Sequence, residues 1–222
     1  MDSQREEKWI KHYSSHHKIL LVGEGDFSFA LCLAKAFGSA SNMVATSLNS
    51  EGFLIVEYSR ASANLKELED LGCTIIHEVN AKSMNTHPLL EMKLFDRIIF
   101  NFPHAGFFCR EDDRSQIMLH QIVVFRFMKS ARKMVTQDGE IHVTHKDGHP
   151  YNRWEIVKLG EKARLSLVEK VPFMITEYPG YVNRRGSGDK CGQSFLVGLS
   201  STFKFSKKTT KQSEIVGWIW WW

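Results

Sequence analysis

Apolar and polar positions along this chain alternate between short apolar runs and stretches with helical spacing. The apolar runs predict seven strands, over residues 19–22, 43–47, 74–79, 95–102, 140–145, 166–173 and 194–199. Helical spacing predicts helices between them, over residues 29–37, 55–71, 117–135 and 153–164. The regular alternation, with the last two strands adjacent in sequence, predicts an α/β fold. We expect one domain with a doubly wound, mostly parallel seven-stranded sheet and an antiparallel edge strand.

A glycine turn stands between the first predicted strand and the first predicted helix, in the sequence KILLVGEGDFS of residues 18–28. Gly23 and Gly25 allow a sharp turn and a close approach of a ligand to the backbone, beside the free N–H groups of a helix start. The third glycine of a dinucleotide fingerprint and the Gly-Lys-Ser/Thr of a P-loop are both missing. Acidic residues in the turn suit a ligand with a cationic amino-acid end and ribose hydroxyls, such as S-adenosylmethionine. An ordinary strand-to-helix turn is the alternative.

Composition narrows the class of protein. A chain of 222 residues with 43% hydrophobic residues is expected to form one globular domain. A net charge of +4 permits a nucleic-acid partner without requiring one. The N-terminus lacks the apolar stretch of a signal peptide, and no run approaches the length of a membrane span. The cysteines lie far apart, which argues against a zinc site or a disulfide framework and for a reducing compartment: Cys32, Cys73, Cys109 and Cys191.

Polar residues follow five of the predicted strands, at the edge of the sheet where ligands bind in such folds. The tetrad after the fourth strand is the most specific of these groups. Pro103 fixes the backbone, so that the Asn101 amide can meet the polar edge of a planar substrate and Phe102 can stack on its ring. His104 can accept a ring proton. The alternative is a strand that ends in a proline turn, with a solvated histidine.

Later in the chain, aromatic and basic residues are interleaved with glycines. Such a loop can follow phosphates and stack an unpaired base, although a solvated connection between strands has a similar composition. The residues concerned are Tyr178, Tyr181, Arg184, Arg185 and Lys190. No metal site is expected, because His12, His16 and His17 lack acidic or thiol partners and His142 and His145 point to opposite faces of one strand.

Several motifs in order make the chain resemble a known family. ILLVGEGDFSF, NMVATSLNS, FDRIIFNFPHAGF, GEIHVTHKDGHPYNRW and TEYPGYVNRRGSGDKCGQSF are similar to the ordered motifs of the eukaryotic 25S rRNA (uridine-N(3))-methyltransferase-like family. The resemblance runs from about His12 to Phe205. It implies a Rossmann-like class I methyltransferase fold, S-adenosylmethionine as methyl donor and N(3) of a uridine in large-subunit rRNA as acceptor. It also implies an rRNA or pre-ribosomal partner and a nuclear or nucleolar location, with the cytoplasm as a further option.

The resemblance also assigns site residues. Cofactor binding falls on Gly23, Glu24, Gly25, Asp26, Phe27, Ser28, Asn49, Ser50 and Asn80. Catalysis falls on Asn101, Phe102, Pro103 and His104, and RNA binding on the interleaved loop. Asn49 and Asn80 stand where the family usually carries aspartates, so they keep an acceptor oxygen but lose a charge. A charged acceptor forms a hydrogen bond of about 1.5–3 kcal/mol against about 1 for a neutral one.

These two substitutions leave a second functional class open, a weak or inactive homologue that acts as an RNA- or protein-binding module. For the whole chain we expect an N-terminal extension over residues 1–17, the methyltransferase domain over 18–205 and a disordered basic, Trp-rich tail over 206–222. We expect a monomer, no membrane association and no metal.

Overall fold

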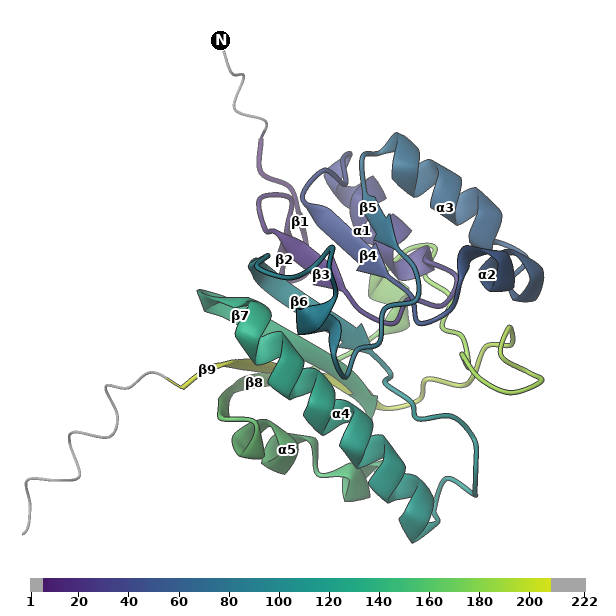
Figure 1. The fold of residues 1–222 in the computed structure, drawn as a ribbon, viewed down its shortest axis with the longest axis vertical. Helices are drawn as coiled ribbons and strands as arrows, with labels where there is room; N and C mark the ends of the chain where they lie inside the picture. The colour runs from purple at the N-terminus through teal and green to yellow at the C-terminus, as the bar shows by residue number, and fades with distance from the viewer. Residues whose placement is uncertain (1–5, 209–222) are drawn as a thin grey trace, which may run out of the picture.

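Seven strands form one sheet in the computed structural model, which describes residues 6–208 (Figure 1). Their order across the sheet is β5-β4-β3-β6-β7-β9-β8. The strands β3 to β7 pair in parallel, and β9 pairs antiparallel with both β7 and β8. The predicted α/β fold with a mostly parallel seven-stranded sheet is confirmed, and its antiparallel strand lies one place in from the edge. The bounds are β3 (Ile19–Leu21), β4 (Met43–Thr46), β5 (Thr74–Ile76), β6 (Phe95–Asn101), β7 (Val135–Lys146), β8 (Leu165–Pro172) and β9 (Ser200–Lys207).

Helices cover both faces of this sheet. On one face lie α1 (Ser28–Phe37), α2 (Glu51–Glu57) and α3 (Ala61–Asp70), and on the other lie α4 (Arg114–Met134) and α5 (Ile156–Lys162) (Figure 1). Short 3₁₀ segments are η1 (Met84–Thr86), η2 (Tyr151–Trp154) and η3 (Ile175–Glu177). The crossover helices between parallel strands therefore leave the carboxyl ends of β3, β4 and β6 together at one edge, where the loops meet.

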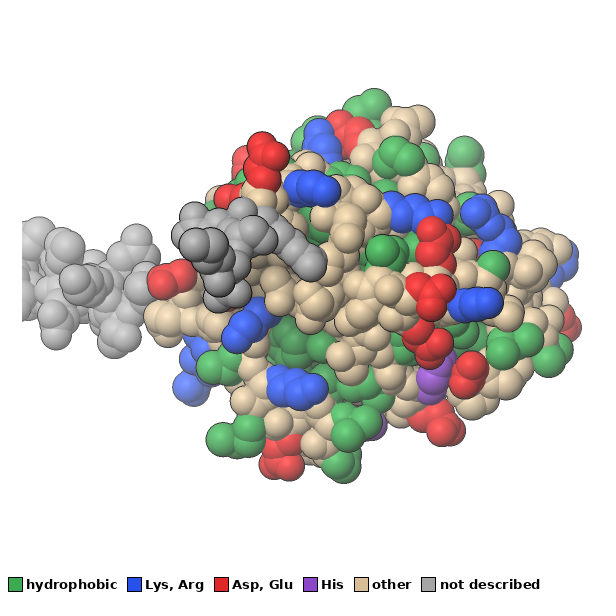
Figure 2. All heavy atoms as spheres, turned by 90° about the horizontal axis from the view of Figure 1, so that it is seen from above, with side chains coloured by type: hydrophobic (Ala, Val, Ile, Leu, Met, Phe, Trp, Pro, Cys, Tyr) green, Lys and Arg blue, Asp and Glu red, His purple; other side chains and the backbone are tan. Residues whose placement is uncertain are grey.

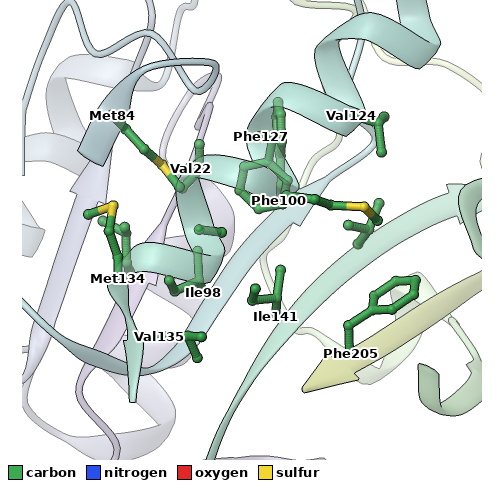
Figure 3. Packing of buried hydrophobic residues seen from close by; sticks show 14 of the residues in the cluster. Val22, Met84, Ile98, Phe100, Val124, Phe127, Met134, Val135, Ile141 and Phe205 are labelled. Atoms are coloured by element: carbon green, nitrogen blue, oxygen red, sulfur yellow. The ribbon is translucent and has the colours of Figure 1, made fainter. Parts of the chain in front are cut away.

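The core consists of two layers separated by the sheet. Leu20 packs into the layer beneath α4 and Leu21 into the layer beneath α1, as the pleat of a strand buried on both faces requires. In the α4 layer the rings of Phe100 and Phe127 lie 5.0 Å apart, edge to face (Figure 3). These layers fix the strand ends, and thus the position of the loops that follow them.

Three predicted elements differ from the structure. The strand predicted over 194–199 is wrong: Leu196 and Leu199 are 86% and 85% exposed, and the last strand is β9, where Phe203 and Phe205 are buried. The helix predicted over 55–71 is two helices, because Tyr58 adopts an extended conformation that ends α2 and buries its ring. The strand predicted over 140–145 begins earlier, because β7 starts at Val135 and a register shift against β6 accommodates residues 137–139.

The predicted N-terminal extension carries structure of its own. A hairpin of β1 (Trp9–Ile10) and β2 (Tyr13–Ser14) packs on the domain, and the Tyr13 hydroxyl lies 3.2 Å from Nδ1 of the buried His142. At the other end β9 extends to Lys207, two residues past the predicted boundary, and the Trp-rich end at 217–222 lies outside the described residues. None of the helices within residues 6–208 has both the length and the apolar character needed to span a membrane.

Charge is distributed without a dominant sign on the face drawn in Figure 2. There, basic, acidic and apolar side chains are interspersed, and no one kind covers the face alone. A site for a charged ligand must therefore come from particular groups brought together at the strand ends rather than from a broad surface field.

Candidate active site

The glycine turn after β3 has the sharp geometry expected from its sequence, and the left-handed backbone conformation occurs at both Gly23 and Phe27. Gly23 has a φ of +69°, and a Cβ there would lie 2.6 Å from the Phe100 ring, so packing as well as conformation requires glycine. Phe27, at the N-cap of α1, has a φ of +60° although it is not glycine, and its ring is fully buried. Ser28 stands where the third glycine of a dinucleotide fingerprint would fall, and the left-handed conformation is taken by the residue before it, Phe27, whose ring is anchored in the core.

A first cavity, of about 130 Å³, opens beside this turn. Residues from the ends of β3, β4 and β6 line it, together with the loop at 181–187. Among those that the sequence predicted are Gly23, Glu24, Gly25, Asp26, Ser28, Asn49, Asn101, Phe102, His104, Tyr181, Arg184 and Arg185. The structure therefore brings most of the predicted cofactor and catalytic residues to one place.

Glu24 lines this cavity as a buried carboxylate. Its Oε2 accepts a hydrogen bond from the Ala30 N–H, and no lysine or arginine among residues 6–208 lies within ion-pair distance of it. Burial raises the pKa of Glu24 to about 8, against the smaller opposing effect of the Ala30 hydrogen bond. A buried carboxylate without a counter-charge fits a ligand that carries a cationic group.

Asp26 already has its partners within the protein. Its carboxylate accepts hydrogen bonds from the Ser28 N–H at 3.0 Å and from Arg184 Nε at 2.8 Å, and only 2% of Asp26 is exposed. The hydroxyl of Ser28 also bonds to the backbone of Val182. The loop that carries Arg184 is therefore tied to the glycine turn. The contact of Asp26 with a cationic ligand remains a prediction, and it requires the Asp26 carboxylate to bind both Arg184 and the ligand.

The predicted residues after β4 and β5 divide between the cavity and the surface. Asn49 lines the cavity. Ser50 caps α2 by accepting from the Phe53 N–H, and exposed Asn80 accepts from the Lys82 N–H. Neither lines the cavity, so their predicted contacts with a cofactor have no geometric support here. Phe27 lies in the core and supports the turn from behind.

Asn101 is the most unusual predicted residue. Both polar atoms of its carboxamide are buried and have no hydrogen-bond partner. Unpaired buried amides are rare because each lost hydrogen bond costs about 1–3 kcal/mol. Since Asn101 ends β6 and lines the cavity, its free donor and acceptor are positioned for a ligand with complementary groups. Phe102 follows with a φ of +47°, and its ring packs edge-on against Phe173 and Phe195.

His104 is engaged in a cluster instead of being solvated. Its Nδ1 accepts from the Gly106 N–H, so the ring proton is on Nε2, which lies 2.9 Å from the Glu111 carboxylate. His120 lies beside this pair, with Nδ1 accepting from the Ala105 N–H, and with Nε2 2.9 Å from Gln116 Nε2 and 3.6 Å from Glu111. The two imidazoles hold the pKa of Glu111 well below its usual range. Neither nitrogen of His104 is free to accept a substrate proton.

The same three side chains lie close enough to hold a metal ion, with ligand atoms within 4.8 Å of one another. A histidine that ligates through Nε2 needs its other nitrogen protonated and donating. Here Nδ1 of both His104 and His120 accepts from a backbone N–H. The hydrogen bonds thus favour a carboxylate held by two imidazoles over a metal centre.

A second cavity, of about 230 Å³, adjoins the first. Both cavities are lined by Phe102, His104, Arg184, Arg185 and Phe195, so they are adjacent. The remaining lining residues of the second cavity are Pro103, Phe107, Glu111, His145, Lys146, Tyr151 and Trp154.

Sequence reasoning identified only part of the second cavity. The sequence assigned no role to His145 or Lys146, and it gave no indication of Tyr151, Trp154 and Phe195, whose aromatic character is the only local signal. Of the predicted RNA-binding residues, Tyr178 is packed between Phe29 and Phe173, and exposed Lys190 lines neither cavity.

Comparison with solved structures shows the same fold. A methyltransferase from Pyrococcus furiosus superposes with a TM-score of 0.54 at 15% identity, covering 87% of this chain and 76% of that one. An S-adenosylmethionine-dependent methyltransferase from Clostridium acetobutylicum gives a TM-score of 0.51 at 11% identity, covering 86% and 84%. The Rossmann-like methyltransferase fold is therefore confirmed.

Sequence relatives cover most of the chain. It is 50% identical over 200 residues to "Heavy metal-associated isoprenylated plant protein 41" and 49% identical over 204 residues to "Uncharacterized protein At4g26485", both from Arabidopsis thaliana. Each match covers 90% of this chain, but 39% of the first relative and 98% of the second. The 25S rRNA (uridine(2634)-N(3))-methyltransferase of Saccharomyces cerevisiae is 25% identical over 234 residues, covering 82% of this chain and 69% of that protein.

A family model described as "BMT5-like: rRNA (uridine-N3-)-methyltransferase BTM5-like" matches residues 20–185. This range contains the glycine turn, the Asn101–His104 tetrad and Arg184. Of the residues that line the two cavities, those outside the range are Gly186, Ser187 and Phe195. By this match the chain belongs to the BMT5-like rRNA (uridine-N3-)-methyltransferase family.

Proposed function

We propose that this chain transfers a methyl group from S-adenosylmethionine to N3 of a uridine in large-subunit rRNA. The observation that carries the proposal is the unpartnered Asn101 amide at the wall of the first cavity, which adjoins the second. The family match and the yeast relative, which is named for uridine N(3) of 25S rRNA, support this choice of substrate. The alternative of an inactive binding module is not favoured by these findings.

The first cavity supplies the groups that a methyl donor needs. S-adenosylmethionine carries a methyl group on a sulfonium together with an ammonium and ribose hydroxyls. Glu24 balances the positive charge, and Asn49, at the end of β4, meets the ribose. The donor supplies an activated methyl group, and the protein supplies orientation and charge balance.

The acceptor side of the site holds the uracil edge. The imide of uracil presents an N–H between two carbonyl oxygens, and the Asn101 carboxamide offers both a donor and an acceptor to this edge. Phe102 sets the plane of the base from its position at the border of the two cavities. His104, with both nitrogens engaged, orients Glu111 and the loop instead of accepting the N3 proton.

The partner follows from the substrate. Arg184 and Arg185 line both cavities. Since Asp26 holds the Arg184 guanidinium, Arg185 meets the phosphate next to the target nucleotide. The chain acts on rRNA within a pre-ribosomal particle, in the nucleus or nucleolus, as a monomer. The bases around the target uridine are held by the particle and not read by an extended protein surface.

The test is an in vitro assay with purified chain, S-adenosylmethionine and large-subunit rRNA lacking modifications, followed by nucleoside mass spectrometry for 3-methyluridine. Asn101→Ala is the matched inactive variant, and calorimetry with the donor measures binding separately. Formation of 3-methyluridine by the unmodified chain supports the proposal. Absence of donor binding up to millimolar concentration would instead show a binding module.

A further inference from the structure

The second cavity contains a cation without an anionic partner. Lys146 lines this cavity at the end of β7, half-buried, and no carboxylate among residues 6–208 lies within ion-pair distance of its Nζ. Its neighbours on the same part of the sheet differ: Lys170 lies 2.8 Å from Asp147, and Lys204 lies 2.8 Å from Glu169. Lys146 is therefore a positive charge that a ligand has to complement.

Aromatic rings hold this ammonium group in place. Nζ of Lys146 lies 4.8 Å from the centre of the Tyr151 ring, 5.3 Å from that of Phe195 and 3.4 Å from the Tyr151 hydroxyl. Cation–π contacts and the long hydrogen bond orient the group without neutralising it. The ammonium group is thus positioned against two rings and has no carboxylate partner among residues 6–208.

The sheet places Lys146 beside Asn101. In the parallel pair of β6 and β7, Asn101 lies opposite Thr144, and Lys146 is two residues farther along β7. Side chains two residues apart on a strand project from the same face, so Asn101 and Lys146 leave the sheet on one face and at one end. Asn101 lines the first cavity and Lys146 the second, so the two residues border the adjoining cavities from one face of the sheet.

We infer that the second cavity receives the uracil ring of the target uridine and that Lys146 stabilises the negative charge which develops on a uracil carbonyl oxygen as N3 loses its proton. The inference rests on the proposed function and adds to it the residue that makes N3 nucleophilic. Phe102, Tyr151 and Phe195 supply the stacking faces, as flipped or unstacked bases require.

The step balances without a covalent intermediate. The N3–H bond breaks and its proton passes to solvent, because neither nitrogen of His104 is free. The imide charge is shared by N3 and the two carbonyl oxygens, where the ammonium group of Lys146 lowers its energy. A bond forms between N3 and the methyl carbon as the carbon–sulfur bond of the donor breaks, and that electron pair stays on the now neutral sulfur.

The test compares Lys146→Met with the control Lys170→Met. Lys170 also lies over an aromatic ring, that of Phe203, but it lines neither cavity. Turnover is measured with the full chain on unmodified rRNA as a function of pH. Lys146→Met should lower kcat about a hundredfold near neutrality, the usual effect of removing one anion-stabilising group. The loss should shrink about tenfold per pH unit toward alkaline pH as hydroxide takes over deprotonation, and Lys170→Met should follow the unmodified chain.

A substrate change separates this role from phosphate binding. RNA that carries 5-fluorouridine has a more acidic N3–H, so it should restore most of the turnover of Lys146→Met while donor affinity, measured by calorimetry, stays unchanged throughout. A variant that raises KM alone, with the pH profile of the unmodified chain and no rescue by 5-fluorouridine, would overturn the inference. An unmodified chain that forms no 3-methyluridine would overturn the proposed function instead.

Discussion

Glu24 gives a prediction in which stability and function change in opposite directions. Burial raises its pKa from 4.5 to about 8, so the folded protein binds this proton more tightly than the unfolded chain does. For an acid with a raised pKa, the free energy of unfolding is highest below pH 4.5, the pKa of the unfolded chain. It falls as the pH rises from 4.5 to about 8 and is constant above about pH 8. Glu24→Gln removes the ionisation and should therefore stabilise the protein at neutral pH.

The magnitude follows from the pKa interval. Each unit corresponds to about 1.4 kcal/mol, so at pH 7 the unmodified chain loses at most about 3 kcal/mol relative to a permanently neutral side chain. In a domain of this size that corresponds to a rise in Tm of roughly 6–12 °C. The glutamine oxygen keeps the hydrogen bond from the Ala30 N–H.

Thermal unfolding of both proteins from pH 4 to pH 9 is the assay, with Glu69→Gln, on the exposed side of α3, as the control. The difference in Tm between Glu24→Gln and the unmodified chain should vanish near pH 4 and grow toward pH 8. The same variant should bind S-adenosylmethionine more weakly, because the charge opposite its cationic groups is gone. A Tm difference that is zero, negative or independent of pH would refute the reasoning.

Three further predictions concern the same site. Asp26→Asn should destabilise the chain by about 3 kcal/mol in urea unfolding, because Arg184 loses the anion it is buried against, and Asp26→Asn with Arg184→Met should recover part of this loss. Asn101→Ala should lower kcat at least about tenfold with unchanged donor affinity in calorimetry, while stability in urea stays level or rises because an unpaired buried amide is removed. His104→Gln should leave the position of the pH–rate profile unchanged between about pH 5 and 8, since neither ring nitrogen is free, whereas loss of a limb in that range would identify His104 as the base.

The sequence predicts the parts of this protein that depend on local pattern. Strand β3 followed by two glycines and α1 is readable from eleven residues, and so is the proline turn after Asn101. The predicted strand over 194–199 failed because Leu196 and Leu199 face solvent although Val197 is buried, and only pairing with β7 and β8 selects 200–207 instead. Local pattern carries no information about which strand a segment will join.

Pairings between distant residues were out of reach for the same reason. Asp26 and Arg184 are 158 positions apart, and nothing in either neighbourhood indicates that the acidic turn is neutralised by the basic loop. The sequence likewise could not show that Lys146 lacks a carboxylate partner, because this depends on where the fold places every nearby carboxylate. The residue types at the strand ends could be predicted from the sequence, but which of these residues form ion pairs depends on the fold.

Arg184 joins the walls of the two cavities. Its guanidinium is bound to Asp26 at the glycine turn, and its side chain borders both cavities. One ion pair therefore ties a loop near the end of the chain to a turn near its beginning. Because that pair belongs to the walls of both cavities, breaking it would alter the shape and the charge of both at once.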